Sequence, residues 1–192
     1  MEDPDILFGI YCPPHPQPLL SPEASEGYAK LRQAYDTCRE RIENSNADLI
    51  IVYSTTWPSI IGHQIQAHPE PEWVHVDDDF HYLGSMPYKF KMDVDFAECL
   101  RDSAKERGLH SRTIAYNGFP IDTGSVVALK LLNPDNRIPA CIVSSNMYAN
   151  RAETIVLGKS IRDALAKQGK KAIAVVAVSY THLTLPTKPF VG

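Results

Sequence analysis

The 192-residue chain has few cysteines, no run of basic residues and no apolar stretch long enough to span a membrane. Its four cysteines, Cys12, Cys38, Cys99 and Cys141, lie far apart and form no CxxC pair. We therefore expect reduced, mostly buried thiols rather than a zinc site or disulfides. A formal charge of -4 and a pI near 6.0 argue against nucleic-acid binding. The acidic first residues are unlike a signal peptide, so we expect a cytoplasmic protein that does not enter a membrane.

What the sequence does contain is a continuous apolar segment that stops at small polar residues. Residues 49–53 (Leu-Ile-Ile-Val-Tyr) are apolar or aromatic throughout, which is typical of a strand covered on both faces. Ser54, Thr55 and Thr56 end this run. Because open α/β sheets bind their ligands at the carboxyl ends of strands, the segment is a candidate site.

Strand patterns alternate with helix patterns, which predicts an α/β fold with a mainly parallel central sheet flanked by helices. Strands are expected at 6–12, 49–53, 73–76, 111–115, 140–143 and 172–178, with a short extended segment at 88–92. Helices are expected at 22–43, capped by Ser21, and at 60–67, 96–106, 125–132 and 153–167. The strand residues expected to be buried in one sheet are Ile50, Val52, Val74, Ile142, Val143, Val175 and Val176.

The end of the chain does not continue this pattern. Residues 179–188 resemble translated sequencing-adapter read-through, so we expect a partial domain over 1–178 and a non-native tail over 179–192. On this expectation the fold is truncated at its C-terminus. Residues 172–178 should still pair in the sheet, because seven apolar residues need cover on both faces.

Three loops that follow expected strands carry polar or imidazole side chains. One surrounds His15, one surrounds Thr55 and Thr56, and one contains Asp122, Thr123 and Gly124. If the strands are parallel neighbours, all three loops open at the same edge of the sheet. The sequence therefore predicts a pocket there.

Five ordered blocks are distinctive: Ile-Val-Tyr-Ser-Thr-Thr-Trp (51–57), Trp-Val-His-Val-Asp (73–77), Leu-Gly-Ser-Met-Pro-Tyr (83–88), Gly-Phe-Pro-Ile-Asp-Thr-Gly (118–124) and Leu-Asn-Pro-Asp (132–135). In this order and spacing they resemble the B-type class III extradiol ring-cleavage dioxygenases. The likeness is greatest to the alpha-type branch of the enzymes that cleave 2-aminophenol. It implies a role in the oxidative cleavage of 2-aminophenol or a catechol-like ring.

Catalytic members of this family hold ferrous iron with two histidines and a glutamate, which leaves positions open for substrate and dioxygen. The resemblance places the first histidine at His15. It places the second at Thr56, and a further active-site histidine of an Asp-His-Gly pattern at Thr123, after Asp122. A threonine hydroxyl is a poor neutral ligand for Fe(II) and cannot shuttle protons near neutral pH. The resemblance therefore implies a vestigial pocket that binds Fe(II) weakly or not at all.

The alpha-type branch is understood to support a catalytic beta-type paralogue. We therefore expect a hetero-oligomer with such a paralogue, acting on an aromatic small molecule. Two alternatives stay open. The chain is itself an Fe(II) dioxygenase that uses His15 and an unorthodox ligand such as His63, or it is a stand-alone small-molecule binding protein.

Other candidate residues have simpler interpretations. His63 is expected on the surface or packed on a short helix. His75 and His81 flank the acidic run 77–79, which is typical of a solvated, exposed turn. An aromatic substrate could face Tyr53, Trp57 and Tyr116, although core packing or contact with another chain explains these side chains equally well.

Overall fold

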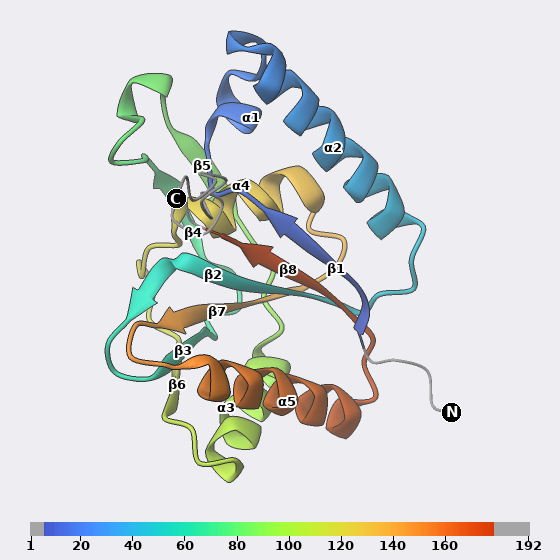
Figure 1. Ribbon diagram of the computed structural model, residues 1–192, viewed down its shortest axis with the longest axis vertical. Coiled ribbons are helices and arrows are strands. Elements are labelled where there is room, and N and C mark those ends of the chain that lie inside the picture. Colours follow the sequence, from blue (N-terminus) through green and yellow to red (C-terminus); the bar gives the residue numbers. More distant parts are fainter. Residues whose placement is uncertain (1–5, 179–192) are drawn as a thin grey trace, which may run out of the picture.

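The computed structural model describes residues 6–178, which form an α/β fold with a six-stranded central sheet (Figure 1). The strands are β1 (Ile6–Cys12), β2 (Leu49–Ser59), β3 (His63–Gln66), β4 (Glu72–His75), β5 (Met86–Lys89), β6 (Ser111–Ile114), β7 (Ala140–Asn146) and β8 (Ala172–Ala177). The α-helices are α1 (Gln17–Leu20), α2 (Glu26–Glu43), α3 (Val94–Glu106), α4 (Thr123–Leu132) and α5 (Arg151–Gln168). The predicted fold class is confirmed.

The central sheet has the strand order β1-β8-β2-β7-β3-β6, and only β7 and β3 pair in antiparallel fashion within it. β2 lies between β8 and β7, so the strand predicted at 49–53 is an interior strand. β8 pairs with both β1 and β2, which confirms the expected pairing of the 172–178 segment over Ala172–Ala177. The predicted tail at 179–192 lies outside the described residues.

Helices cover both faces of the sheet (Figure 1). α2 and α4 pack on the face to which Ile50 and Val52 of β2 point, and α3 and α5 pack on the face of Leu49 and Ile51. Successive side chains of a strand point to opposite faces, so a strand covered twice needs an unbroken apolar run. All four side chains are buried, as the sequence predicts.

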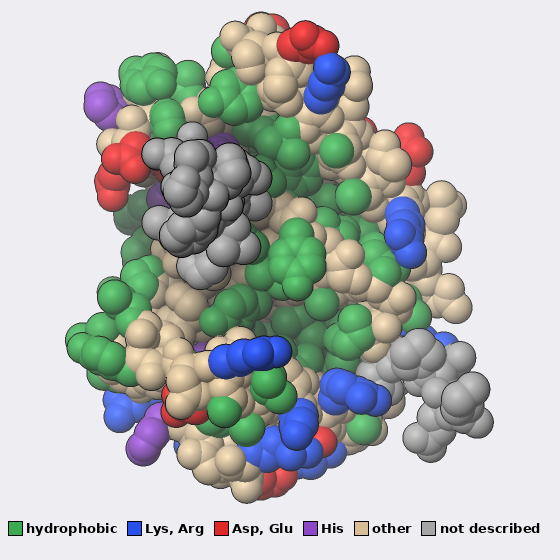
Figure 2. Space-filling view, viewed as in Figure 1, with side chains coloured by type: hydrophobic (Ala, Val, Ile, Leu, Met, Phe, Trp, Pro, Cys, Tyr) green, Lys and Arg blue, Asp and Glu red, His purple; other side chains and the backbone are tan. Residues whose placement is uncertain are grey.

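Ion pairs link the two helices on one of these faces. In Figure 2, Lys and Arg side chains gather over the lower part of the molecule, where α3 and α5 lie in Figure 1. Lys167 Nζ donates to Glu106 Oε2 at 2.7 Å, and Arg107 pairs with Asp163. Lys167 and Arg107 are therefore paired across the two helices.

The helix predicted at 60–67 is wrong. β2 continues to Ser59, and after a turn the chain forms β3, whose buried Ile65 lies opposite Val143 of β7. Gly62 in the turn has a φ of 93°, and a Cβ there would clash with the backbone of His110. A positive φ favours glycine and interrupts a helix. An apolar segment this short does not distinguish a helix from a strand by its periodicity.

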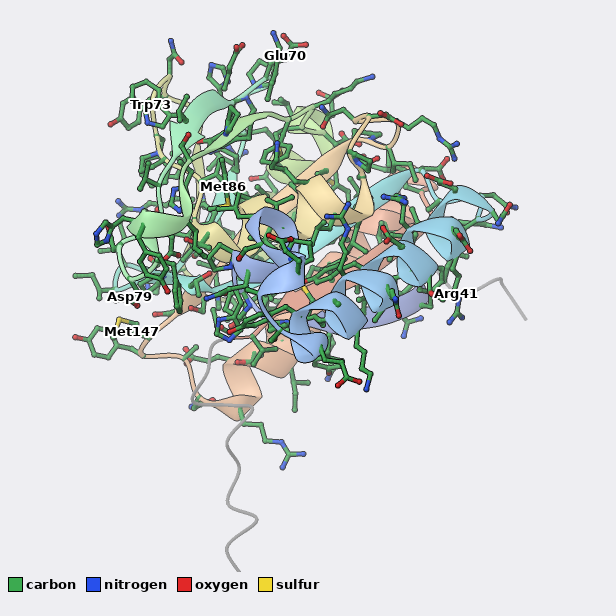
Figure 3. The ribbon with its side chains drawn as sticks, turned by 90° about the horizontal axis from the view of Figure 1, so that it is seen from above. Arg41, Glu70, Trp73, Asp79, Met86 and Met147 are labelled. Carbon is green, nitrogen blue, oxygen red and sulfur yellow. The ribbon has the colours of Figure 1, made fainter. Side chains whose placement is uncertain are left out.

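β4 and β5 form a separate antiparallel hairpin rather than part of the main sheet. Met86 and Tyr88 are buried in the core shared with α4, whereas Trp73 lies on the outer side (Figure 3). Val74 is 54% exposed, so the prediction that it is a buried residue of the main sheet is wrong. Three consecutive residues of β4, Glu72, Trp73 and Val74, are exposed, so neither face of this strand is fully covered. Val176 of β8 is half-buried, whereas the other five residues of that prediction are buried.

The long helix predicted from residue 22 begins later, at Glu26. Ser25 is its N-cap, and the Ser25 hydroxyl accepts the Tyr28 N–H at 3.1 Å. The residues Pro22–Ala24 instead form a single 3-10 turn. Both Ser21 and Ser25 fit the sequence preference for an N-cap, so the preference alone did not locate the first turn.

Candidate functional site

The three predicted loops meet at one edge of the sheet. A cavity of about 480 Å³ is lined there by Pro14, His15, Thr56, His75, Asp77, Asp78, Asp79, Phe80, Asp122 and Thr123. His15 follows β1, Thr56 lies in the second half of β2, and Asp122 caps α4. The structure thus brings together His15, Thr56, Asp122 and Thr123, and it adds residues from β4 and the acidic segment after it.

Asp122 organises the part of the cavity next to the sheet. As N-cap of α4, it accepts the Ser125 N–H at 3.0 Å and the Ser125 hydroxyl at 2.7 Å. The hydroxyls of Ser54 and Thr56 donate to the same Oδ2 at 2.6 Å and 2.5 Å. A helix N-terminus favours a carboxylate at this position. Asp122 is therefore an acceptor for four donors and joins β2 to α4.

The Thr56 hydroxyl is hydrogen-bonded as both donor and acceptor. It donates to Asp122 and accepts the Gly124 N–H at 3.2 Å. Gly124 packs so closely that an added Cβ would lie 2.5 Å from Thr56 Oγ1, 3.0 Å from Pro14 Cβ and 3.2 Å from Ala177 Cβ. This close approach requires glycine, and it fixes the Thr56 side chain between β2 and the first turn of α4.

Thr123 is hydrogen-bonded toward the hairpin instead. Its hydroxyl donates to Asp77 Oδ2 at 2.5 Å, and His75 Nε2 lies 2.7 Å from the same Thr123 oxygen. Asp77 Oδ1 accepts the backbone N–H groups of Asp79 and Phe80 at 3.0 Å and 2.9 Å. The side chains of His75, Thr123 and Asp77 therefore form a continuous hydrogen-bonded chain in the cavity wall.

The sequence alone did not predict this arrangement. The interpretation of 77–79 as a solvated turn is wrong for Asp77, which is half-buried, and right for the exposed Asp78 and Asp79. His75, which flanks this run, is half-buried and lines the cavity. A run of like charges does not reveal which of its members turns inward. A signal was available in the block Trp-Val-His-Val-Asp (73–77), which contains both His75 and Asp77.

Both histidines of the cavity are half-buried and neutral near pH 7. Burial lowers the pKa of the His15 and His75 imidazoles below the usual value, and the charge of Asp77 acts in the opposite direction on both. The Phe80 ring contacts His15 edge-on, with the ring centroids 6.2 Å apart. Neutral imidazoles offer one donor and one acceptor each, so the cavity is equipped for hydrogen bonding rather than for binding anions.

The side chains of the cavity do not fit a mononuclear iron site. Within residues 6–178, no three His, Cys, Asp or Glu side chains are grouped so that they could hold a metal ion. The hydroxyl protons of Thr56 and Thr123 are donated to Asp122 and Asp77. Fe(II) sites are built from imidazole and carboxylate ligands, so a threonine hydroxyl is a poor ligand. A hydroxyl that is already hydrogen-bonded in this way is a poorer ligand still.

The three aromatic candidates lie outside this cavity. Trp57 packs on Phe119 with ring centroids 5.7 Å apart, and Tyr116 contacts the same ring but is 65% exposed. Tyr53 lines a different cavity of about 730 Å³, together with Cys12. Burial raises the pKa of the Cys12 thiol to about 11, so this cysteine is protonated at neutral pH, as a packing residue is expected to be.

His63 is neither on the surface nor on a helix. It lies in β3, is 1% exposed, and its Nδ1 is 3.4 Å from the Ser144 carbonyl oxygen. Burial lowers the pKa of this imidazole. It lines a separate cavity of about 420 Å³ with His110, Arg112 and Glu153. The structure therefore does not bring His63 to the cavity that contains His15.

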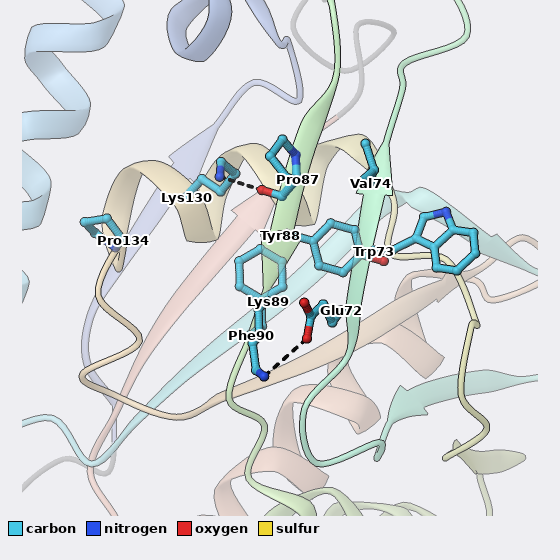
Figure 4. A pocket seen from close by; sticks show the side chains of 9 residues that line it. All are labelled: Glu72, Trp73, Val74, Pro87, Tyr88, Lys89, Phe90, Lys130 and Pro134. Atoms are coloured by element: carbon cyan, nitrogen blue, oxygen red, sulfur yellow. Dashed lines mark hydrogen bonds and ion pairs between the residues drawn. The ribbon is translucent and has the colours of Figure 1, made fainter.

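A larger cavity of about 790 Å³ lies over the β4–β5 hairpin (Figure 4). Its charged groups bond to one another or to the backbone: Lys89 pairs with Glu72 at 3.2 Å, and Lys130 donates to the Pro87 carbonyl at 2.7 Å. The ring of Trp73 lies at one side. This surface offers apolar contact area but not the converging polar groups of the His15 cavity.

Comparison with known proteins places the chain in a family. The family described as the catalytic LigB subunit of aromatic ring-opening dioxygenase matches residues 9–182. Over 174 residues the chain is 29% identical to the 2-aminophenol 1,6-dioxygenase alpha subunit of Pseudomonas sp, covering 90% of this chain and 64% of that protein. Over 204 residues it is 27% identical to the beta subunit, covering 98% and 67%.

More distant relatives share the fold. The chain is 22% identical over 145 residues to 3,4-dihydroxyphenylacetate 2,3-dioxygenase of Escherichia coli, covering 74% of this chain and 52% of the relative. A crystal structure of an uncharacterized protein from Escherichia coli K12 matches with a TM-score of 0.54 and 16% identity, over 76% of this chain and 51% of that one. The chain thus spans about two thirds or less of the length of these proteins.

No helix among residues 6–178 has the length and apolar character needed to cross a membrane. The family match extends over most of the chain and confirms the resemblance inferred from the five sequence blocks. The chain therefore belongs to the LigB family of aromatic ring-opening dioxygenases.

Proposed function

We propose that this chain is the non-catalytic, alpha-type subunit of a class III extradiol dioxygenase that opens 2-aminophenol or a catechol-like ring. In this proposal a paralogous beta-type subunit holds the Fe(II) and performs the chemistry in a cytoplasmic hetero-oligomer. The observation that carries the proposal is the hydrogen bonding of Thr56 and Thr123. Both stand where the family resemblance expects imidazoles, and both donate their protons to aspartates of this chain.

The chemistry of these two side chains supports the proposal. The family resemblance places an iron ligand at the first position and a further active-site histidine at the second. A hydroxyl bonded to a carboxylate is a poor ligand for Fe(II) and cannot replace an imidazole in proton transfer near neutral pH. Asp122 also has a structural role as the cap of α4, and Gly124 leaves no room for a larger residue beside Thr56.

The names of the relatives also support a two-subunit assembly. The chain is similar to both an alpha and a beta subunit of 2-aminophenol 1,6-dioxygenase, at 29% and 27% identity. The two values are too close to assign the subunit type. The assignment to the alpha type therefore rests on Thr56 and Thr123 and not on overall identity.

The test is to produce the chain together with a beta-type paralogue from the same source and to purify through a tag on this chain. We expect a stable complex in which the paralogue contains the iron and ring cleavage requires its histidines. The variant Thr56→Ala in this chain should leave the turnover number of the complex within about twofold, because no reacting group is removed. Alanine at the paralogue's histidine matching Thr56 should abolish turnover.

Two results would contradict the proposal, and each favours one alternative. Turnover by this chain alone, lost in His15→Ala, would identify it as an Fe(II) dioxygenase in its own right. Tight binding of an aromatic ligand by a chain that forms no complex with the paralogue would identify a stand-alone binding protein.

A further inference from the structure

The two outer edges of the β4–β5 hairpin differ in what covers their backbone groups. Val74 lies opposite Pro87, which has no N–H, so these two residues form a pair without hydrogen bonds between them. Such pairs alternate along an antiparallel ladder, and both of their residues direct N–H and C=O away from the neighbouring strand. Glu72 and Lys89 form the next pair of this kind. The outer edge of β4 therefore carries the backbone groups of Glu72 and Val74, and the outer edge of β5 carries those of the other two residues.

The edge of β5 is closed to a further strand. Pro87 offers no donor there, and its C=O accepts the Lys130 Nζ at 2.7 Å (Figure 4). The Lys89 C=O accepts the side-chain amide of Asn136, also at 2.7 Å. Proline at an edge, and cover by a neighbouring helix or loop, keep edge strands from pairing with other chains. One edge of the hairpin is therefore protected.

The edge of β4 lacks this protection within residues 6–178. No described residue bonds to the outward N–H and C=O groups of Glu72 and Val74, and β4 contains neither proline nor lysine. Beside these groups lies apolar surface, because Trp73 is 57% exposed and Val74 is exposed as well. Figure 3 shows Trp73 at the periphery of the molecule. An exposed apolar edge with free backbone groups is suited to strand addition, in which another chain supplies the next strand.

The charge around this edge determines which chain it fits. Residues 70–79 contain five carboxylates and no lysine or arginine. Lys89, across the hairpin, is already paired with Glu72 at 3.2 Å. If two copies paired through β4 in antiparallel fashion, Glu72 of each would lie toward the acidic run 77–79 of the other, and parallel pairing would bring like residues together. Both arrangements oppose carboxylates to carboxylates, so the edge fits a different chain that carries Lys or Arg.

We propose that the outer edge of β4 is the docking surface for the beta-type partner subunit, which adds an extended strand to the hairpin. The backbone of that strand bonds to Glu72 and Val74, its apolar side chains cover Trp73, and its Lys or Arg side chains face the acidic residues on either side. The cavity of about 790 Å³ over the hairpin gives an anchoring side chain room beside Trp73 and Val74. The identity of the partner rests on the proposed function, whereas the surface rests on the hairpin alone.

The first experiment measures the affinity of this chain for the purified beta-type paralogue by biolayer interferometry. Val74→Pro removes an outward N–H but no bond within this chain, as Pro87 across the hairpin already does. We expect the affinity to fall at least about tenfold, because the added strand loses a hydrogen bond and meets the proline ring. Val74→Thr keeps the N–H and the branched shape, so it is the matched control and should stay within about threefold of wild type. Equal affinity in Val74→Pro and wild type would overturn the inference.

Hydrogen exchange of the unmodified chain is the second measurement, and it decides the matter alone if Val74→Pro does not fold. The amides of Glu72 and Val74 should exchange quickly in the isolated chain and at least about tenfold more slowly in the complex. The amides of Trp73 and His75, which face β5, are the internal reference. A complex in which the outward amides exchange as fast as in the isolated chain would overturn the inference.

A charge variant tests the chemistry of the partner strand. Glu72→Gln removes one carboxylate of the edge and keeps the side-chain shape, so we expect the affinity to fall about threefold and to depend less on salt. An affinity equal to that of wild type or higher would contradict a cationic partner strand.

Failure of this inference is distinct from failure of the proposed function. A complex that forms equally well with Val74→Pro docks elsewhere, and the proposed function stands. A wild-type chain that forms no complex with the paralogue contradicts both. A dimer of the isolated chain in which the Glu72 and Val74 amides are protected would identify a second copy as the occupant and overturn the inference.

Discussion

Thr56 and Thr123 line the same cavity, but the fold uses them differently. Thr56 bonds to Asp122 and Gly124, which belong to the start of α4, and these bonds close its surroundings. Thr123 bonds to Asp77 and His75, which belong to the hairpin and the segment after it. This series of hydrogen bonds ends at the half-buried imidazole of His75. Thr56 thus joins β2 to α4, whereas Thr123 joins α4 to the hairpin and the segment after it.

This difference follows from what surrounds each residue. Thr56 lies in an interior strand, where every polar group must find a partner within the protein. Thr123 faces a two-stranded ribbon that is covered on one side only. We therefore expect substitutions around Thr56 to reduce stability more than substitutions around Thr123 do.

The largest effect is expected from Asp122→Ala. The variant removes the N-cap of α4 and leaves the Ser54 and Thr56 hydroxyls without their acceptor. The loss of a cap and of buried partners should lower the free energy of unfolding by about 3 kcal/mol. Urea denaturation measures this loss. Asp122→Asn retains a capping oxygen and should lose clearly less, and equal losses in the two variants would show that the cap contributes little.

Gly124→Ala should come next. Its Cβ would press on Thr56, Pro14 and Ala177, and overpacking of this kind lowers the free energy of unfolding by about 2 kcal/mol. Gly158→Ala in α5 is the matched control, because its Cβ would meet no atom within 4 Å and alanine is the better helix former. Thermal unfolding should show opposite signs for the two variants. A neutral Gly124→Ala would mean that β2 and α4 are not closely joined.

Asp77→Ala should have a smaller effect on stability and a clear effect on the tautomer of His75. It removes the acceptor of Thr123 and of two backbone N–H groups in a half-exposed segment, which we expect to lower the free energy of unfolding by about 1 kcal/mol. Without this acceptor Thr123 can donate to His75 Nε2, which would move the proton of the neutral imidazole to Nδ1. Urea denaturation measures the stability and imidazole 15N NMR measures the tautomer, and the exposed Asp79→Ala should change neither.

The smallest effect concerns a histidine outside the cavity. Because burial lowers the pKa of His63 in the folded state, the unfolded chain binds more protons once the pH falls below about 6.5. The free energy of unfolding should therefore decrease with falling pH in this range and be flat above it. His63→Gln should reduce this slope in urea titrations, with the remainder due to His15 and His75. An unchanged slope would show that His63 titrates alike in both states.

The sequence determined the main layers of the fold because the signals there are local and redundant. The unbroken apolar run of β2 predicted an interior strand, and the helices predicted at 96–106 and 153–167 lie within α3 and α5. The helix predicted at 60–67 failed because a short apolar segment with an internal glycine has no distinctive period. Its strand character comes from pairing with β6 and β7, which are distant in sequence.

The candidate site was predictable only in part. That His15, Thr56 and Thr123 share one sheet edge follows from the direction of parallel strands. The position of His75 does not, because it depends on how a hairpin with no pairing to the main sheet packs beside α4. The hydrogen bonds of Asp77 are likewise tertiary, and the run of three aspartates concealed which of them turns inward.

The central claim is that neither threonine serves as a metal ligand and that this chain does not hold the iron. The most direct measurement is anaerobic titration of the metal-free chain with Fe(II), followed by determination of bound iron after gel filtration. We predict far less than one Fe(II) per chain, with no change in His15→Ala, because two of the expected imidazoles are replaced. One Fe(II) per chain, bound at low micromolar concentration and lost in His15→Ala, would contradict the account.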